Sequence, residues 1–166
     1  MLQGRAVRVS FRPNLTADAR RLYSNRARGN PVYAGSFIRQ RRIVLDRELI
    51  DRPRELARIL VHELFHFAWV RLGNPARQSY AALLAEEFAA HARGELGWSA
   101  EWRKRELSGP LSSRQWREYV CESFCDTAAW LYSGVHTHAE YTLASRHRRR
   151  RAEWFRATLS SGVIPI

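Results

Sequence analysis

The sequence predicts one α+β domain over residues 1–166, with a small sheet near the N-terminus and a mainly helical remainder. Residues 5–11 alternate apolar and polar side chains, which is the period of a half-buried strand. Leu56, Leu60, Leu64 and Ala68 recur every four residues, which is typical of a helix with one buried face. A chain of this length buries about 70% of its unfolded surface and needs no disulfides to sustain a core.

The first third of the chain is expected to be mixed. In the strand at 5–11, Val7, Val9 and Phe11 are expected on one side. Thr16 and Asp18 offer an N-cap for a short helix over 19–28, which Gly29-Asn30-Pro31 would stop. Two extended stretches are predicted next, at about 32–39 and 41–45.

Four helices are predicted in the rest of the chain. The first follows Asp51-Arg52-Pro53 and ends at Gly73-Asn74-Pro75, because proline suits the first turn and glycine the end. The others cover about 78–94, with Leu83, Leu84 and Phe88 buried, about 113–133, and about 139–159. Residues 95–113 are expected to form a partly irregular connector.

Composition limits the class of protein. No apolar run approaches the roughly 20 residues of a membrane-spanning helix, and the N-terminus lacks a signal-peptide pattern, so we expect a cytoplasmic protein with no membrane partner. Cys121 and Cys125 lie four apart in one predicted helix and are interpreted as small buried packing residues rather than a disulfide framework.

The net charge of +12 permits binding to nucleic acid but does not establish it, because 27 of the 28 basic residues are arginine, a bias that codon composition can produce. The densest basic run is interpreted as a solvated helix face, with Trp154 and Phe155 as core anchors of the same helix. That run comprises Arg146, Arg148, Arg149, Arg150 and Arg151.

The residues His62-Glu63-Leu64-Phe65-His66 form an HExxH motif on the first predicted long helix. Residues four apart share a helix face, so both imidazoles can bind one Zn²⁺, with Glu63 placed beside the metal as a general base for zinc-bound water. About 0.015 such matches are expected by chance in this composition, so the motif predicts a zinc site.

A catalytic zinc site needs a third protein ligand. No histidine follows at the spacing of metzincins, which excludes that group. The candidates are Glu122, the pair Glu86 and Glu87, and His91. Glu122 is preferred because Asp126 follows one helical turn later and can accept a hydrogen bond from a ligand histidine.

The segment Glu122-Ser123-Phe124-Cys125-Asp126 resembles the glutamate helix of gluzincins, the clan of thermolysin and anthrax lethal factor, and the chain length resembles that of a single-domain minigluzincin. The resemblance implies a zincin-like fold, in which a small twisted sheet packs on the HExxH helix and the glutamate helix completes the site. It also implies His62, His66 and Glu122 as zinc ligands, Glu63 as general base and Asp126 as the partner of His62.

The expected activity is zinc-dependent hydrolysis of peptide bonds in a peptide or protein substrate. Tyr132, His136, His138 and Tyr141 are all available to stabilise the oxyanion, and of these His138 and Tyr141 are nominated. An edge strand within 37–45 would bind extended substrate, with Arg39, Arg41 and Arg42 favouring acidic segments. The alternatives are a basic, nucleic-acid-associated protein, either a protease of SprT-like type or one with a structural zinc site, and a metal-binding regulator without turnover.

Overall fold

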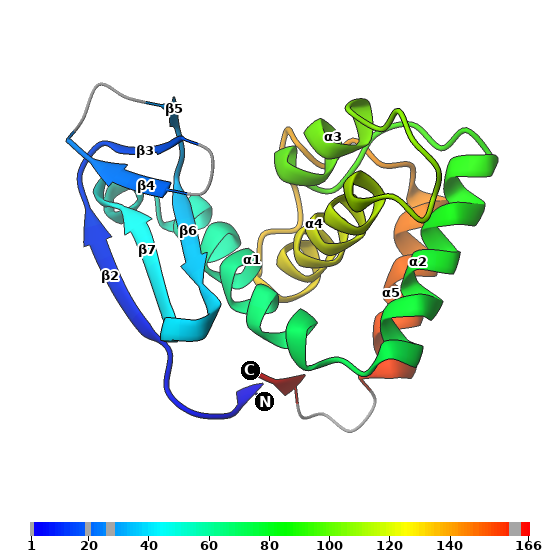
Figure 1. The fold of residues 1–166 in the computed structure, drawn as a ribbon, viewed down its shortest axis with the longest axis horizontal. Helices are drawn as coiled ribbons and strands as arrows, with labels where there is room; N and C mark the ends of the chain where they lie inside the picture. Colours follow the sequence, from blue (N-terminus) through cyan, green and yellow to red (C-terminus); the bar gives the residue numbers. More distant parts are fainter. Residues whose placement is uncertain (1, 19–20, 26–28, 160–163) are drawn as a thin grey trace.

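The computed structural model describes residues 2–18, 21–25, 29–159 and 164–166, and these form a mixed α+β structure. The described part contains five α-helices and two sheets of three strands each. The two sheets lie on one side of the long helix α1, and the other helices lie on the opposite side (Figure 1). The expectation of an α+β fold is confirmed at this level. In the described part, no helix has both the length and the apolarity to cross a membrane.

The first sheet has the order β2-β7-β6, from Arg8–Arg12, Arg42–Asp46 and Ala34–Phe37. β7 runs parallel to β2 and antiparallel to β6. The expected edge strand within 37–45 is wrong, because 42–45 belong to the central strand and 38–40 form a 3-10 helix, while the edge strand on this side is β6. Ile43, Val44 and Leu45 are all buried, as in a strand covered on both faces.

The strand expected at 5–11 is present as β2, but its faces were assigned wrongly. Val9 and Phe11 are about 40% exposed, at 41% and 38%, whereas Ser10 between them is half-buried. β2 is an edge strand with a short inner face. The alternation of apolar and polar side chains therefore predicted a strand but not which of its two faces packs against the core.

The second sheet has the order β4-β3-β5, from Arg21–Ser24, Leu15–Asp18 and Asn30–Pro31. The helix expected over 19–28 is wrong where the structure describes it, because 21–24 pairs antiparallel with β3, with Tyr23 opposite Thr16. Residues 19–20 and 26–28 of that expectation lie outside the described residues. Strand pairing with β-branched and aromatic neighbours outweighs a weak helix propensity in so short a segment.

Helix α1 spans Pro53–Arg71 and begins with proline in its first turn, as the sequence predicts. Its apolar side covers the first sheet, where Ile43, Leu45, Leu49 and Phe67 form a buried cluster. Phe65 on another side of α1 joins the larger cluster with α2, α4 and α5. α1 thus contributes to both cores, which fixes it between the sheets and the helices.

The remaining helices differ from expectation mainly at their ends. α2 spans Asn74–Ala89, starting directly after Gly73, with Phe88 40% exposed rather than buried. The expected connector at 95–113 contains α3 at Trp98–Arg105. α4 spans Arg114–Tyr132, close to the predicted 113–133, and is capped by Ser113, and α5 spans Ser145–Thr158, shorter than expected.

α5 begins later because the residues before it form irregular structure with its own core. Tyr141 and Leu143 are buried together with Leu96 and Val135. The Arg148 guanidinium donates to the backbone carbonyls of Leu143 and Tyr141, which holds this segment against the first turn of α5. Short elements complete the chain: the 3-10 helices Ile38–Gln40 and Arg47–Asp51, and the parallel strands β1 (Leu2–Gln3) and β8 (Ile164–Pro165) near the two termini (Figure 1).

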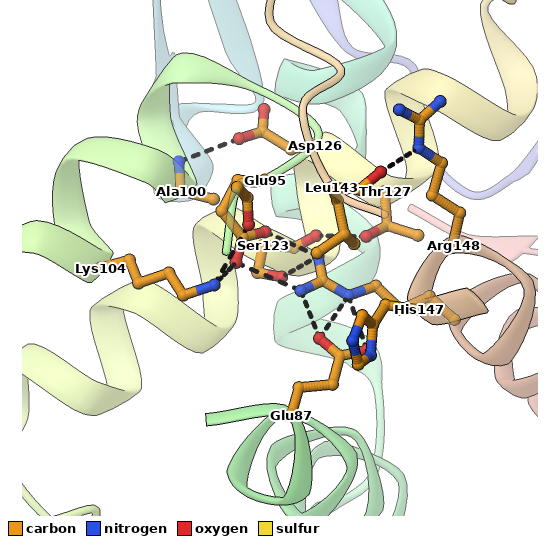
Figure 2. A network of polar contacts seen from close by, with 12 residues as sticks. Glu87, Glu95, Ala100, Lys104, Ser123, Asp126, Thr127, Leu143, His147 and Arg148 are labelled. Atoms are coloured by element: carbon orange, nitrogen blue, oxygen red, sulfur yellow. Dashed lines mark hydrogen bonds and ion pairs between the residues drawn. The ribbon is translucent and has the colours of Figure 1, made fainter. Parts of the chain in front are cut away.

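The helical layer is joined by a buried charge network around Arg151, which has no exposed surface. Its guanidinium binds Glu87 of α2 at 2.6 Å, Glu95 at 2.7 Å and the Ser123 hydroxyl of α4 at 2.9 Å. Figure 2 shows Glu87, Glu95 and Ser123 converging on this network, with Lys104 reaching Glu95 at 3.1 Å. Phe155 of the same helix is buried, as predicted, and Trp154 packs beside it.

The basic run on α5 is therefore not a uniform solvated face. Arg151 lies in the core, Arg148 binds backbone carbonyls, and Arg150 pairs with Glu86 of α2. The interpretation of the run as a solvated helix face is wrong for Arg151. Two buried carboxylates from other elements compensate its charge, so it can lie in the core.

Candidate metal centre

The HExxH residues lie in the middle of α1. His62 and Glu63 are buried, and His66 is half-buried one turn after His62. The two imidazole rings meet edge to face with their centroids 5.0 Å apart. One turn of helix thus presents both rings on the same side, as their spacing predicts.

Helix α4 brings Glu122 to the two histidines. α1 and α4 pack through aromatic side chains, with the Phe65 and Phe124 ring centroids 5.8 Å apart. Glu122 Oε2 lies 3.3 Å from His62 Nε2 and 3.9 Å from His66 Nε2. The three residues expected as zinc ligands are therefore brought together, although 55 residues separate His66 from Glu122 along the chain.

These separations suit a metal ion. Zinc bonds of about 2.0–2.1 Å in tetrahedral geometry hold two nitrogen or oxygen ligands about 3.3 Å apart. Two imidazole nitrogens and a carboxylate oxygen are the ligand set of catalytic zinc sites, which leave a fourth position open. His62, His66 and Glu122 fit a zinc ion by donor type. The 3.3 Å between His62 Nε2 and Glu122 Oε2 also fits by spacing, whereas the 3.9 Å between His66 Nε2 and Glu122 Oε2 is longer than the ideal separation.

Asp126 contacts the other nitrogen of His62. Its Oδ1 lies 2.7 Å from His62 Nδ1, and its Oδ2 accepts a hydrogen bond of 2.9 Å from the backbone N–H of Ala100 in α3. A carboxylate at Nδ1 holds a proton on that nitrogen and directs Nε2 toward Glu122. The first turn of α3 thereby fixes the carboxylate that orients His62 (Figure 2).

Glycine 97 makes room for this contact. A Cβ atom at Gly97 would lie 2.3 Å from the Asp126 carboxylate carbon. The backbone before α3 can therefore approach Asp126 this closely only without a side chain.

Glu63 points toward the edge strand. Its Oε2 lies 2.5 Å from the hydroxyl of Ser36 in β6, and the same hydroxyl lies 3.1 Å from the Glu63 backbone carbonyl. Sequence reasoning missed Ser36. The one signal for Ser36 in the sequence was a small polar residue in an extended segment shortly before the strand at 42–46.

Charge dominates the site. Burial lowers the pKa of His62, but Asp126 and Glu122 outweigh burial and hold that pKa well above its ordinary value. Burial also opposes the charged form of His66, yet Glu122 raises the His66 pKa to about 9. Burial raises the pKa of Glu122, but the two histidines lower it to about 2. Without a metal ion, protonated histidines compensate the carboxylates, and a bound cation would replace those protons.

Both cysteines contact His66 on its second nitrogen. Cys125 Sγ lies 3.4 Å and Cys121 Sγ 3.6 Å from His66 Nδ1. Donor atoms of His62, His66 and Cys125 all lie within 4.8 Å of one another. The interpretation of the cysteines as packing residues is incomplete, because their sulfur atoms face a titratable ring.

The rival third ligands are engaged elsewhere. The Glu87 carboxylate is buried against Arg151, and Glu86 pairs with Arg150 on the surface. His91 is exposed just beyond the end of α2, at a positive φ of 52°. Within the described residues, Glu122 is the candidate that the structure places beside the Nε2 atoms of His62 and His66.

The nominated oxyanion donors have contacts near the start of α1. His138 Nε2 pairs with Glu55, two turns of α1 before His62 and thus about 10 Å along its axis. His138 Nδ1 accepts a hydrogen bond from the backbone N–H of Glu140, so both ring nitrogens are occupied. Tyr141 is buried with its ring centroid 5.5 Å from that of His138. These contacts give His138 and Tyr141 a place in the packing around the start of α1.

Comparison of the chain with protein-family models, with curated proteins and with solved structures found no match.

Proposed function

We propose that this protein is a zinc-dependent hydrolase of peptide bonds, similar in its site to gluzincins. The observation that carries the proposal is that Glu122 Oε2 lies 3.3 Å from His62 Nε2 and 3.9 Å from His66 Nε2, with the Asp126 carboxylate on the far side of His62. Zinc at these three side chains would supply a Lewis acid that lowers the pKa of a coordinated water to about 7.

Glu63 is the residue of the chain suited to proton transfer. It follows His62 directly in the sequence, and its side chain is buried. Within the described residues, its carboxylate hydrogen-bonds to Ser36 and to neither Asp126 nor Glu122. Its carboxylate takes a proton from the attacking water and returns it to the leaving amine. Ser36 holds that carboxylate from the sheet side through its 2.5 Å contact.

The edge strand β6 supports a peptide as substrate. β6 carries Ser36 and has no neighbouring strand on its outer side within the described residues. An extended peptide can pair with such an edge beside Glu63. Two of the three arginines proposed to favour acidic substrates are already engaged. Arg42 stacks on Phe37 with its guanidinium 4.3 Å from the ring centroid, and Arg41 donates to the backbone carbonyls of Arg5 and Ala6.

The test combines metal analysis with hydrolysis. Purified wild type should contain about one zinc by elemental analysis and should cleave members of a peptide library. Glu122→Ala should lose the zinc, while Glu118→Ala, one turn earlier on the same helix, should keep it. Glu63→Gln should keep the zinc and lose cleavage by at least about a hundredfold.

Two outcomes contradict the proposal in different ways. If Glu122→Ala retains its zinc, the ligand assignment is wrong. If wild type contains zinc but Glu63→Gln cleaves peptides as wild type does, the role of Glu63 is wrong. If wild type contains no zinc even after it is refolded or purified in the presence of zinc, the whole proposal is contradicted.

A further inference from the structure

His66 presents its two ring nitrogens to two chemically different groups. Nε2 faces the Glu122 carboxylate, whereas Nδ1 faces two thiols at 3.4 and 3.6 Å. Neither cysteine has a role in the proposed hydrolysis, and both are free thiols. The chain contains two cysteines in all, and both lie at this one ring.

The helices account for this convergence. Cys121 and Cys125 lie one turn apart on α4, so their side chains share one face. α1 packs against that face and brings His66 opposite both sulfurs. Cys125 is fully buried, whereas Cys121 is half-buried and the His66 side chain is 19% exposed. Solvent can therefore reach the cluster of these three side chains from the side of Cys121 and His66.

We propose that His66 Nδ1, Cys121 Sγ and Cys125 Sγ form a sulfur-rich site for a thiophilic metal ion such as Cd²⁺ or Cu⁺. The spacing of a metal site of this kind can be taken from zinc, whose bonds of about 2.1 Å to nitrogen and about 2.3 Å to sulfur hold those atoms about 3.6 Å apart in tetrahedral geometry. The two observed separations of 3.4 and 3.6 Å agree with that value.

The donor set determines the class of metal. Two thiolates and an imidazole favour soft ions, whereas the set with Glu122 contains an oxygen ligand and suits zinc. Binding would displace the thiol protons to solvent. A neutral imidazole has one free lone pair, so His66 can serve one of the two sites at a time. The thiol site itself does not require that the protein be a hydrolase.

The test is titration of chelator-treated protein with Cd²⁺, followed by the ultraviolet absorption of cadmium–thiolate bonds. Wild type and Glu122→Ala should both develop this absorption and saturate at about one equivalent. Cys121→Ser should bind at least tenfold more weakly, and His66→Ala should also bind at least tenfold more weakly because the imidazole ligand is lost. Far-ultraviolet circular dichroism checks that each variant is folded.

The half-buried Cys121 is the primary variant, because Cys125→Ser places a hydroxyl in a fully buried position. Absence of the absorption in folded wild type would overturn the proposal. So would an unchanged Cd²⁺ affinity in His66→Ala, which would show binding by the thiols alone. The signal is independent of peptide cleavage, so failure of the proposed hydrolase activity and failure of the thiol site are separate results.

Discussion

At the scale of single residues, the site is defined by what lies behind each ligand. His62 is backed by the carboxylate of Asp126 at 2.7 Å, whereas His66 is backed by two sulfur atoms. A carboxylate is a much stronger acceptor than a thiol, so the orientation of His62 is fixed more firmly than that of His66. Glu63 has a third kind of partner, the Ser36 hydroxyl on the edge strand.

Ser36 offers a test of how the base is held. Under the proposed function, Ser36→Ala should lower kcat about tenfold, because one hydrogen bond that orients Glu63 is lost. The zinc content and KM should stay near the wild-type values, since Ser36 contacts neither histidine in the described interactions. Steady-state kinetics and elemental analysis provide the two readouts.

Ser36→Thr is the matched control, because it keeps the hydroxyl and should retain most of kcat. Equal losses in Ser36→Thr and Ser36→Ala would mean that the hydroxyl is not what matters. Loss of zinc in Ser36→Ala would assign the effect to the fold of the site instead.

At the scale of elements, helix α3 holds the Asp126 carboxylate in place beside His62. Its first turn donates the Ala100 N–H to Asp126, and the preceding Gly97 lies against the same carboxylate. An N–H at the start of a helix stabilises a carboxylate charge, so α3 supports the negative Asp126 beside His62. Sequence reasoning placed this helix within an irregular connector.

Gly97→Ala should disturb the site without changing any ligand. The new methyl group would lie 2.3 Å from the Asp126 carboxylate and would push it away from His62. Zinc affinity should fall about 10–100-fold, the usual effect of losing the partner of a ligand histidine. Competition with a chromophoric chelator measures this affinity.

Gly73→Ala is the comparison, because Gly73 also precedes a helix but its nearest neighbouring atom would be 3.6 Å from the new methyl group. It should bind zinc as wild type does. Wild-type affinity in Gly97→Ala would show that Asp126 does not need its observed position to orient His62.

At the scale of the whole molecule, the excess of positive charge is partly internal. Arg151 and Arg58 are buried, and each is paired with two carboxylates: Glu87 and Glu95 for Arg151, Glu55 and Glu140 for Arg58. These pairs join α5 to α2 and to the segment between α2 and α3, and they join α1 to the segment before α5. Buried arginines therefore contribute to the architecture, which weakens the argument from net charge to a nucleic-acid partner.

The charges of the metal centre predict how stability depends on acid. Folding lowers the Glu122 pKa from 4.5 to about 2, so ionised Glu122 stabilises the fold above pH 4.5, and this stabilisation is lost as the pH falls toward 2. In the presence of a chelator, wild type should lose roughly 1–2 kcal/mol more than Glu122→Gln between pH 6 and pH 3. Urea denaturation at the two pH values measures this difference.

Glu118→Gln provides the control on the same helix. Its carboxylate is one-third exposed and binds Arg103 and Arg114, so its stability difference from wild type should change by only a few tenths of a kcal/mol. A pH dependence of Glu122→Gln identical to that of wild type would mean that Glu122 is not ionised against the histidines in the folded protein.

Features that depend on neighbours along the chain were predictable from the amino-acid sequence. The limits of α1 and α4 follow from proline, serine and glycine at their ends, and the placement of His62 and His66 on one face follows from helix geometry. The pairing of Glu122 with Asp126 as a one-turn carboxylate motif was also visible, as was the α+β class.

Contacts between residues far apart in the sequence could be seen only in the folded structure, because burial and contact partners depend on how different helices and strands pack together. The folded structure paired 21–24 as a strand instead of a helix, made β6 the edge beside Glu63, and drew Arg151 into the core. It placed Ser36 on Glu63 and both cysteines on His66, and it left His138 bound to Glu55. A local pattern constrains the period and direction of a side chain, whereas its partner is set by how the helices and sheets pack.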